Sequence, residues 1–302
     1  MNAFKPLTRQ GIGPSCVSLT PGPWPTLLDF LTERFPGVTR QTWLERMVRG
    51  DVIDEQGEPV TPGRASQPPY LPHQRVYYYR EVPHEPRIPF DEVVLFEDAH
   101  LIVVDKPHFL PVVPSGGYLV ETVLVRLKKK LGLDDLVPIH RIDRDTAGLV
   151  MFSKQPATRA AYCALFSQRA VHKTYEAIAP WRGDLTFPLT RQSRIKEAGH
   201  FMLQHEVPGP ANAITHIDVL EVRGALARYQ LKPVTGQRHQ LRVHMLGLGL
   251  PLQGDGLYPT LTPEGQVDHA NPLQLLAKAL EFIDPVTGVA QRFVSQRALH
   301  FT

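Results

Sequence analysis

In the segment "PIHRIDRDTAGLVMFSK", residues 138–154, a dense run of charged residues is followed almost directly by a run of apolar residues. One histidine, two arginines and two aspartates fall within residues 140–145, and "GLVMF" follows two residues later. An apolar run bounded in this way is typical of a buried strand, so we expect the charged residues to form the loop that leads into this strand. Charges that lie partly out of water are costly unless they are paired. The loop therefore either anchors the strand through ion pairs or presents a charged group to a ligand.

Composition narrows the class of protein without identifying it. The chain has 302 residues and a net charge of +3, which suits roughly one or two domains and permits an acidic partner. Cys16 and Cys163 lie far apart, so we expect no disulfide framework and no thiolate metal site. We see no apolar core of a signal peptide and no stretch near the ~20 apolar residues of a membrane span. We therefore expect a cytoplasmic protein with no membrane partner.

The first part of the chain predicts a small unit of its own. We expect an irregular arm over residues 1–22, a small α/β unit over 23–80 and a proline-rich linker over 81–90. Helical spacing of apolar residues predicts helices in residues 25–35 and 39–50, and a hairpin turn near Gln56-Gly57. In the second helix the expected apolar stripe and capping box comprise Trp43, Leu44, Met47 and Val48, and Thr42 with Glu45.

Residues 91–302 predict an α+β domain. Strands outnumber helices and do not alternate strictly with them, which favours a largely antiparallel or mixed sheet flanked by helices. Helices are expected in residues 119–132, ending at Gly132, and in 157–169. Strands are expected in residues 92–107 (two, around Asp98-Ala99), 148–154, 172–181, 213–222, 226–234 and 240–248.

A second polar stretch, "KPVTGQRHQLRVH" at residues 232–244, contains no acidic residue. If residues 240–248 form a strand, then Arg238, Gln240, Arg242 and His244 share one face. The spacing of His239 and His244, with no cysteine or extra carboxylate nearby, does not indicate zinc, so we expect no metal. Asp255, within Gly254-Asp255-Gly256, is interpreted as part of a structural turn.

Three basic clusters, at residues 126–130, 169–173 and 232–244, together favour a nucleic-acid-binding surface over a merely solvated one. A kinase is excluded as an explanation of "HRID". No glycine-rich loop precedes a strand with lysine, and no Asp-Phe-Gly follows.

Taken together, these segments resemble the RluA-type pseudouridine synthase family over roughly residues 90–302. The matching segments occur in the order of the family's motifs, which makes the set far more specific than any one of them. They are "VVDKPHFLPVVPSG" (103–116), "HRIDRDTAGLVMF" (140–152), "HKTYEAI" (172–178), "TGQRHQLRVH" (235–244), "PLQGDGLY" (251–258) and "FIDPVTG" (282–288).

The resemblance implies conversion of uridine in ribosomal or transfer RNA to pseudouridine, without cofactor or metal. It implies that Asp143 is the catalytic aspartate, that Arg242 pairs with it and keeps it charged, and that Tyr175 lies against the target base. Asp145 is the rival carboxylate, but the motif spacing leaves it outside this role. Further substrate-binding candidates are Arg141, which would fill the gap left by a flipped nucleotide, together with His140, Ile142, Val243 and Arg238.

The unit at residues 23–80 resembles the S-four RNA-binding domain through "VTRQTWLERMVRGDVIDEQGEPV" (38–60). Its implied RNA contacts are Arg40, Arg46 and Arg49; the alternative is a structural appendage. For the whole chain the alternative is a non-catalytic RNA-binding or assembly factor on the same fold. A paired nucleophile would be needless in a binder, so Asp143, Tyr175 and Arg242 favour the enzyme. We expect a monomer.

Overall fold

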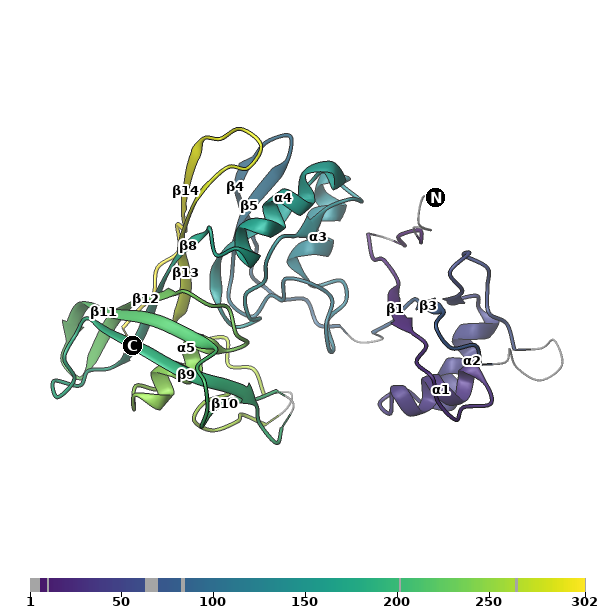
Figure 1. The fold of residues 1–302 in the computed structure, drawn as a ribbon, viewed down its shortest axis with the longest axis horizontal. Coiled ribbons are helices and arrows are strands. Elements are labelled where there is room, and N and C mark those ends of the chain that lie inside the picture. Colours follow the sequence, from purple (N-terminus) through teal and green to yellow (C-terminus); the bar gives the residue numbers. More distant parts are fainter. Residues whose placement is uncertain are drawn as a thin grey trace. The chain divides into compact units, whose positions relative to one another are not determined.

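The structure, a computed structural model, describes residues 6–9, 11–62, 70–82, 85–200, 202–263 and 266–301. The chain divides into two compact units, which are described separately (Figure 1). The first comprises Met1–Glu85 with Gly116–Val120, and the second comprises Pro86–Ser115 with Glu121–Thr302. The main boundary lies inside the proline-rich segment 81–90.

The first unit packs two helices against a small antiparallel sheet with the strand order β1-β3-β2. Both expected helices form, and each begins at a threonine whose side chain accepts a hydrogen bond from the backbone: Thr26 from Asp29, and Thr39 from Thr42. The expected capping box of Thr42 with Glu45 is therefore wrong by one turn. The elements are β1 (Ser15–Ser18), α1 (Leu27–Arg34), α2 (Arg40–Val48), β2 (Val52–Ile53) and β3 (Arg75–Tyr78).

Two further expectations for this unit are wrong. The arm over residues 1–22 is not wholly irregular, because β1 pairs with β3, a strand about 60 residues later whose edge the local sequence does not reveal. On α2, Val48 is 70% exposed whereas Arg46 is buried. The Arg46 guanidinium lies 5.0 Å from the Trp43 ring centroid, so its stem covers the aromatic surface that an apolar residue was expected to cover.

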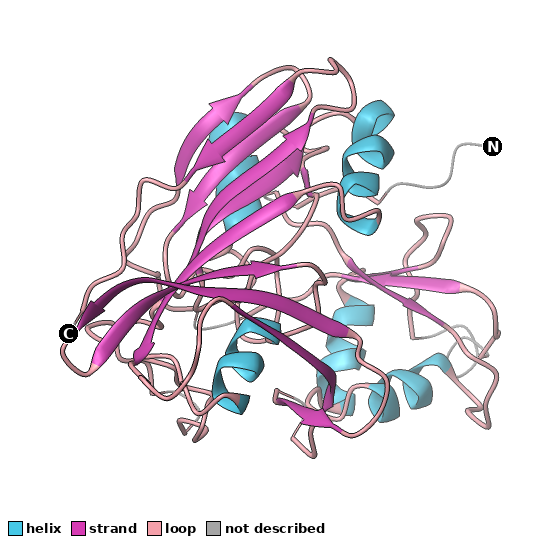
Figure 2. Cartoon of the chain, turned by 60° about the vertical axis from the view of Figure 1, so that its left-hand side comes forward, coloured by secondary structure: helices cyan, strands magenta, loops and turns pink. Residues whose placement is uncertain are grey.

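The second unit is built on one large twisted sheet (Figure 2). Its main path runs β10-β9-β11-β12-β8-β13-β7-β5-β4, with β14 beside β13 and β6 beside β7. Among the described strands of this unit, the pairings are antiparallel except that of β13 with β7, which confirms the predicted α+β class with a largely antiparallel sheet. The strands are β4 (Val93–Glu97), β5 (Leu101–Lys106), β6 (Val137–Pro138), β7 (Ala147–Ser153), β8 (His172–Pro180), β9 (Leu189–Glu197), β10 (Gln204–Val207), β11 (Ala213–Arg223), β12 (Leu226–Pro233), β13 (Leu275–Ile283) and β14 (Ala290–Val294).

Strands β6, β9, β10, β13 and β14 were not predicted. The sequence of β13, "LLAKALEFI", consists largely of good helix formers, yet the strand pairs with β8 on one side and with β7 and β14 on the other. Two-sided pairing and burial override a weak local propensity.

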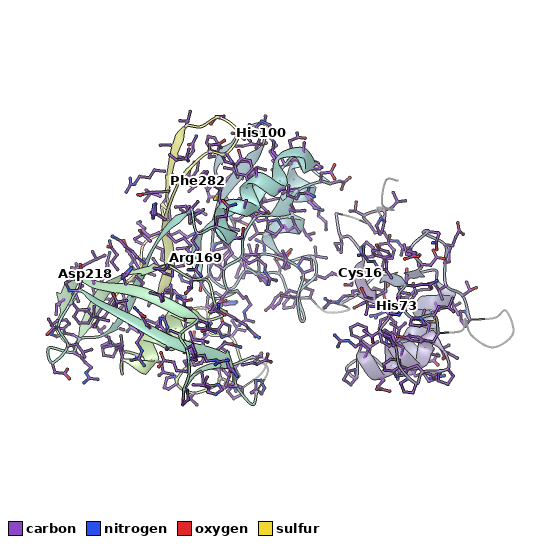
Figure 3. The ribbon with its side chains drawn as sticks, viewed as in Figure 1. Cys16, His73, His100, Arg169, Asp218 and Phe282 are labelled. Carbon is purple, nitrogen blue, oxygen red and sulfur yellow. The ribbon has the colours of Figure 1, made fainter. Side chains whose placement is uncertain are left out.

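Two helices match the prediction: α3 (Val123–Leu131), which ends at left-handed Gly132, and α4 (Pro156–Ser167). Tyr162 of α4 packs into a cluster with Leu149 and Met151 of β7 and Phe282 of β13. Phe282 is labelled in Figure 3. The Tyr162 hydroxyl donates to Asp284 Oδ2 at 2.8 Å. The two cysteines are free and exposed, with Cys16 in the first unit.

The expected strand over residues 240–248 is wrong, because Gln240–Gly247 forms helix α5. Its first six residues are all buried, the polar ones as well as the apolar ones. Polar and apolar residues alternate here, which imitates the period of a strand. A helix that is buried all round has no polar face to give it a helical period.

His244 shows how this helix buries a polar side chain. The residue is fully buried, with Nδ1 2.9 Å from Thr215 Oγ1 on β11 and Nε2 3.1 Å from Ser193 Oγ on β9. Burial lowers the pKa of His244 to about 4. The folded protein therefore keeps this imidazole neutral, with α5 fastened to two strands of the sheet.

This arrangement predicts a pH-dependent contribution of His244 to stability. Above pH 6.5 the imidazole is neutral in both the folded and the unfolded chain, so His244 makes its full contribution to stability. Below pH 6.5 the unfolded chain binds a proton at this imidazole whereas the folded chain does not, and this favours unfolding. The excess free energy of unfolding of the wild type over His244→Gln should therefore shrink by about 2 kcal/mol between pH 7 and pH 4.5. Urea denaturation at the two pH values measures it. For the core substitution Ile217→Val the gap should stay constant, and a constant gap for His244→Gln would contradict the assignment.

Candidate active site

The charged segment 140–145 forms the expected loop, between β6 and β7. His140 fastens it: the imidazole stacks on Phe166, with ring centroids 4.4 Å apart, and its Nε2 accepts a hydrogen bond from the Met151 backbone at 3.1 Å. Burial lowers the pKa of His140 to about 3, so the ring stays a neutral acceptor. At the other end, Gly148 has φ +108°, and a Cβ there would lie 2.3 Å from the Ala277 carbonyl oxygen. Only glycine fits where β7 meets β13.

Two side chains, one at the end of β5 and one just after it, hold the backbone of the same loop. Lys106 is fully buried and donates to the carbonyl oxygens of Pro107, at 2.9 Å, and Arg144, at 2.8 Å. Burial lowers the pKa of Lys106 to about 7, opposed by the charges of Asp145 and Asp143. His108 Nδ1 lies 2.7 Å from the Asp145 carbonyl oxygen. The carbonyls just after Asp143 are thus fixed by the segment 103–116, which the sequence identified as a matching motif without assigning a role to Lys106 or His108.

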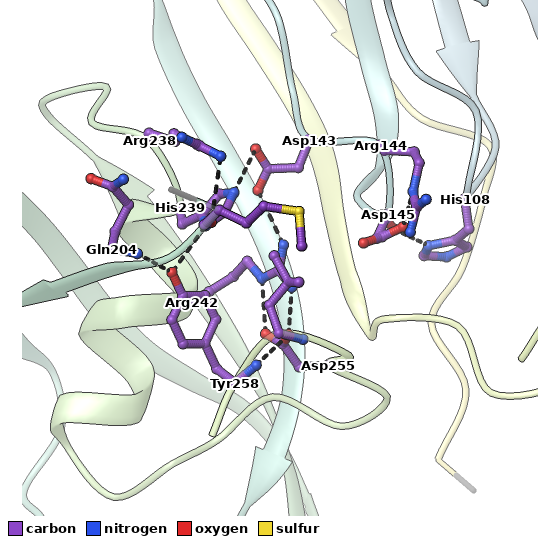
Figure 4. A network of polar contacts seen from close by, with 12 residues as sticks. His108, Asp143, Arg144, Asp145, Gln204, Arg238, His239, Arg242, Asp255 and Tyr258 are labelled. Atoms are coloured by element: carbon purple, nitrogen blue, oxygen red, sulfur yellow. Dashed lines mark hydrogen bonds and ion pairs between the residues drawn. The ribbon is translucent and has the colours of Figure 1, made fainter. Parts of the chain in front are cut away.

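Asp143 presents the accessible carboxylate of this region, with 30% of its side chain exposed. Arg242 Nη1 lies 3.5 Å from Oδ2, and His239 Nε2 lies 3.9 Å from Oδ1 (Figure 4). Asp145 is turned elsewhere, where its Oδ1 accepts a hydrogen bond from Arg144 Nε at 2.8 Å. Of the two rival carboxylates, Asp143 is the one that the structure places against Arg242.

Arg242 has a second and closer partner, Asp255 (Figure 4). Its Nε donates to Asp255 Oδ2 at 2.9 Å and its Nη2 donates to Asp255 Oδ1, and both side chains are 1% exposed. Burial opposes the charge of Arg242, but Asp255 and then Asp143 raise its pKa well above its usual range. Asp255 also accepts the backbone N–H of Leu257 at 2.8 Å, as the predicted structural turn requires. Its role as the main partner of Arg242 was not predicted.

Gln240 fixes the start of α5 and therefore the place of Arg242. Its Oε1 accepts hydrogen bonds from Thr235 Oγ1 at 2.7 Å and from the Gln237 backbone at 3.0 Å. Its Nε2 donates to the Ile214 carbonyl and to Thr215 Oγ1, both at 3.0 Å. The buried amide thus ties the "TGQ" turn and the helix to β11.

Tyr175 lies on β8, where it pairs with Leu231 of β12 and Ala277 of β13 and packs against the core of the second unit. Burial and, secondly, the charge of Asp143 raise the pKa of its hydroxyl above the usual range. The phenol therefore stays protonated at neutral pH beside the Asp143 carboxylate.

The remaining predicted residues differ in their surroundings. Arg141 and Arg238 are exposed and Ile142 is partly exposed. Val243, in contrast, is 3% exposed within a cluster with Ile195, Ala213 and Tyr258. Its expected place as an apolar wall of the substrate site is wrong. The segment 238–244 is a turn and a helix rather than a strand. The expected single face of Arg238, Gln240, Arg242 and His244 is therefore not formed.

In the first unit, two of the three predicted arginines reach solvent. Arg40 pairs with Asp29 at 2.7 Å and is 47% exposed, and Arg49 pairs with Asp51 at 2.8 Å and is 46% exposed. Arg46 is 7% exposed, and burial lowers its pKa, so its prediction as a surface contact is wrong.

Within the described part of the chain, no three His, Cys, Asp or Glu side chains come together in a way that could hold a metal ion. Among the same residues, no helix has the length and apolar character needed to span a membrane.

Comparison with known proteins identifies the family. The family model described as RNA pseudouridylate synthase matches residues 100–246, a range that includes Asp143, Tyr175 and Arg242. The dual-specificity RNA pseudouridine synthase RluA of Haemophilus influenzae is 32% identical over 66% of this chain and 90% of its own. The ribosomal large subunit pseudouridine synthase D of Xylella fastidiosa is 30% identical over 88% of this chain and 83% of its own.

A solved structure agrees in fold. Human RNA pseudouridylate synthase domain containing 1 superposes with a TM-score of 0.56 over 71% of this chain and 86% of its own, at 21% identity. The ordered motifs, the mixed sheet and the sequence relatives lead to one conclusion: the chain belongs to the RNA pseudouridylate synthase family, among its RluA-type members.

Proposed function

We propose that this protein isomerises specific uridines of ribosomal or transfer RNA to pseudouridine, and that Asp143 is its catalytic aspartate. The observation that carries the proposal is the accessible Asp143 carboxylate 3.5 Å from a buried arginine that is itself held by Asp255. A positive charge so placed favours the ionised carboxylate, the form that a nucleophile requires. The names of the relatives given above describe enzymes that act on RNA, and this supports the proposed substrate class.

The reaction is an isomerisation, so atoms are conserved. The bond between C1′ of the ribose and the ring nitrogen breaks, the uracil turns, and C1′ bonds to a ring carbon, which loses its proton while the nitrogen gains one. Cleavage develops positive charge on the sugar, which Asp143 would stabilise or capture. The base must first leave its stack, at a cost of a few kcal/mol. Exposed Arg141 would fill the gap, and Tyr175 would lie against the base.

His140 and Ile142, with Arg238, stay predicted contacts of the substrate. The bonds that His140 makes to Met151 and Phe166 support a role in holding the loop that carries Arg141 and Asp143. Arg238 is exposed beside the same site, where a cation would meet a phosphate. We further propose that the protein acts as a monomer in the cytoplasm; sedimentation equilibrium would test the first point and cell fractionation the second.

Asp143 and Asp145 provide a matched pair for the central test. Asp143→Asn keeps the shape of the side chain and removes its charge, so pseudouridine formation should fall to background while RNA binding persists. Asp145→Asn should keep most of its activity, because its carboxylate pairs with Arg144 and not with Arg242. Release of tritium from RNA labelled at uridine C5 measures both, once pseudouridine mapping in cells with and without the gene has identified the target. The reverse ranking would overturn the assignment, and an active Asp143→Asn would favour a non-catalytic role for this residue.

Arg242 has two roles that can be separated. Arg242→Met alone leaves the Asp255 carboxylate buried without its cation, which should cost about 3–5 kcal/mol of stability. Arg242→Met/Asp255→Asn removes both charges and should recover most of this stability, yet lose at least about 100-fold in kcat, because Asp143 lacks its cation. Thermal melting and the tritium assay together report the two effects. A stable double variant with wild-type kcat would show that Arg242 serves the fold alone.

We also propose that the first unit is an S-four-like RNA-binding domain that uses Arg40 and Arg49. Their exposure supports this, while their ion pairs with Asp29 and Asp51 show that each would have to share its charge with RNA phosphates. Each phosphate contact steepens the salt dependence of RNA binding by roughly one unit of log–log slope. Full-length Arg40→Gln/Arg49→Gln should therefore bind RNA with a slope shallower by about one to two units. An unchanged slope would leave this unit as a structural appendage.

A further inference from the structure

His239 occupies an unusual position next to Asp143. It is the first residue before α5, its backbone is left-handed (φ 55°, ψ 18°), and its side chain does not cap the helix. This conformation is uncommon outside glycine, and it sets the direction in which the imidazole leaves the backbone. The ring lies between the Tyr258 hydroxyl and the Asp143 carboxylate (Figure 4).

The contacts of Tyr258 assign the proton on this imidazole. The Gln204 backbone N–H donates to Tyr258 Oη at 2.7 Å, which leaves the phenol hydrogen for another acceptor. His239 Nδ1 lies 2.9 Å from the same oxygen and is the acceptor in place. Since Nδ1 accepts, the neutral ring carries its proton on Nε2. Burial lowers the pKa of His239, against the opposing charge of Asp143, so the ring has this one N–H at neutral pH.

The Nε2–H group lies near Asp143 but does not hydrogen-bond to it. The 3.9 Å between Nε2 and Asp143 Oδ1 exceeds hydrogen-bonding distance, and Nε2 makes no hydrogen bond to any residue that the structure describes. A hydroxyl oxygen could lie about 2.8 Å from both atoms, accept the Nε2–H and donate to Oδ1. The pair therefore has the spacing of a receptor for one hydroxyl group.

We propose that His239 donates its Nε2–H to the 2′-hydroxyl of the target ribose, with Tyr258 as the positioning residue that sets the tautomer. The proposal rests on the proposed role of Asp143. If that carboxylate approaches C1′ to within about 3 Å, the 2′-oxygen on the adjacent carbon lies within reach of a donor beside the carboxylate. The 3′ and 5′ oxygens of an internal nucleotide are bound in phosphodiesters, so the 2′-hydroxyl is its free sugar hydroxyl. Recognition of this group distinguishes RNA from DNA.

The test compares ribose with 2′-deoxyribose at one position. The probe is a synthetic oligoribonucleotide that spans the uridine found by pseudouridine mapping, made with either sugar at that uridine alone. For the wild type, removal of the 2′-hydroxyl should lower kcat/KM about tenfold, the effect of one lost hydrogen bond. His239→Asn should lose about tenfold on the ribose probe and nothing further on the deoxyribose probe. Asparagine tolerates the left-handed backbone, but its amide is too short to take the place of Nε2.

The loss caused by His239→Asn and the loss caused by removal of the 2′-hydroxyl should therefore not multiply. If His239 had only a structural role, its substitution would lower activity equally on both probes. A His239→Asn variant that keeps the full tenfold ribose preference overturns the proposal. So does a wild type that treats the two probes alike, a result that needs no variant. His216→Asn, at an exposed histidine on β11, should keep both the wild-type rate and the preference.

Tyr258→Phe tests the tautomer separately. Without the hydroxyl, the imidazole can carry its proton on either nitrogen, so the ribose preference should fall at least about twofold; an unchanged preference would refute the role of Tyr258. A wild type that forms no pseudouridine in any probe would refute the proposed function itself, whereas an active wild type that is indifferent to the 2′-hydroxyl refutes only this inference.

Discussion

The arrangement of the active site depends on the buried ion pair between Arg242 and Asp255. Each side chain is 1% exposed, and a buried charge left alone would cost several kcal/mol. The pair therefore holds α5 and the turn around Asp255 together. It also aims the remaining guanidinium nitrogen at Asp143, on a loop about 100 residues earlier in the chain. The position of the cation beside the candidate nucleophile is thus fixed by a buried partner, Asp255.

A second constraint is that the buried polar groups around the site have matched partners. Gln240 uses both ends of its amide, His244 uses both ring nitrogens, and Lys106 donates to two backbone carbonyls. Buried polar groups that are satisfied in this way favour a single arrangement, because any displacement would leave one of them without a partner. The loop of Asp143 and the first turn of α5 are therefore held rigidly, as a site that must act on one atom of a large substrate requires.

The imidazoles around Asp143 add hydrogen-bonding groups without adding charge. Burial lowers the pKa of His108, His140 and His239, so these rings are neutral at neutral pH. Arg242 is the cation that contacts the Asp143 carboxylate, and the histidines serve as oriented hydrogen-bonding groups. This division places one cation against the carboxylate and leaves directional donors, among them His239, for the sugar.

The sequence by itself determined the class of the fold, most of its elements and the residues of the candidate site that lie within ordered motifs. The apolar run after "HRIDRD" identified β7 and the loop of Asp143, and Gly132 marked the end of α3, because these signals depend on residues close together in the chain. Only the tertiary structure decided that residues 240–247 form a helix, that Val243 and Arg46 are buried, and that Asp255, Gln240 and Tyr258 belong to the site. The physical reason is the same in each case. A polar residue inside a helix buried all round, or an arginine stem over Trp43, is stabilised by partners from distant segments, and local periodicity contains no information about such partners.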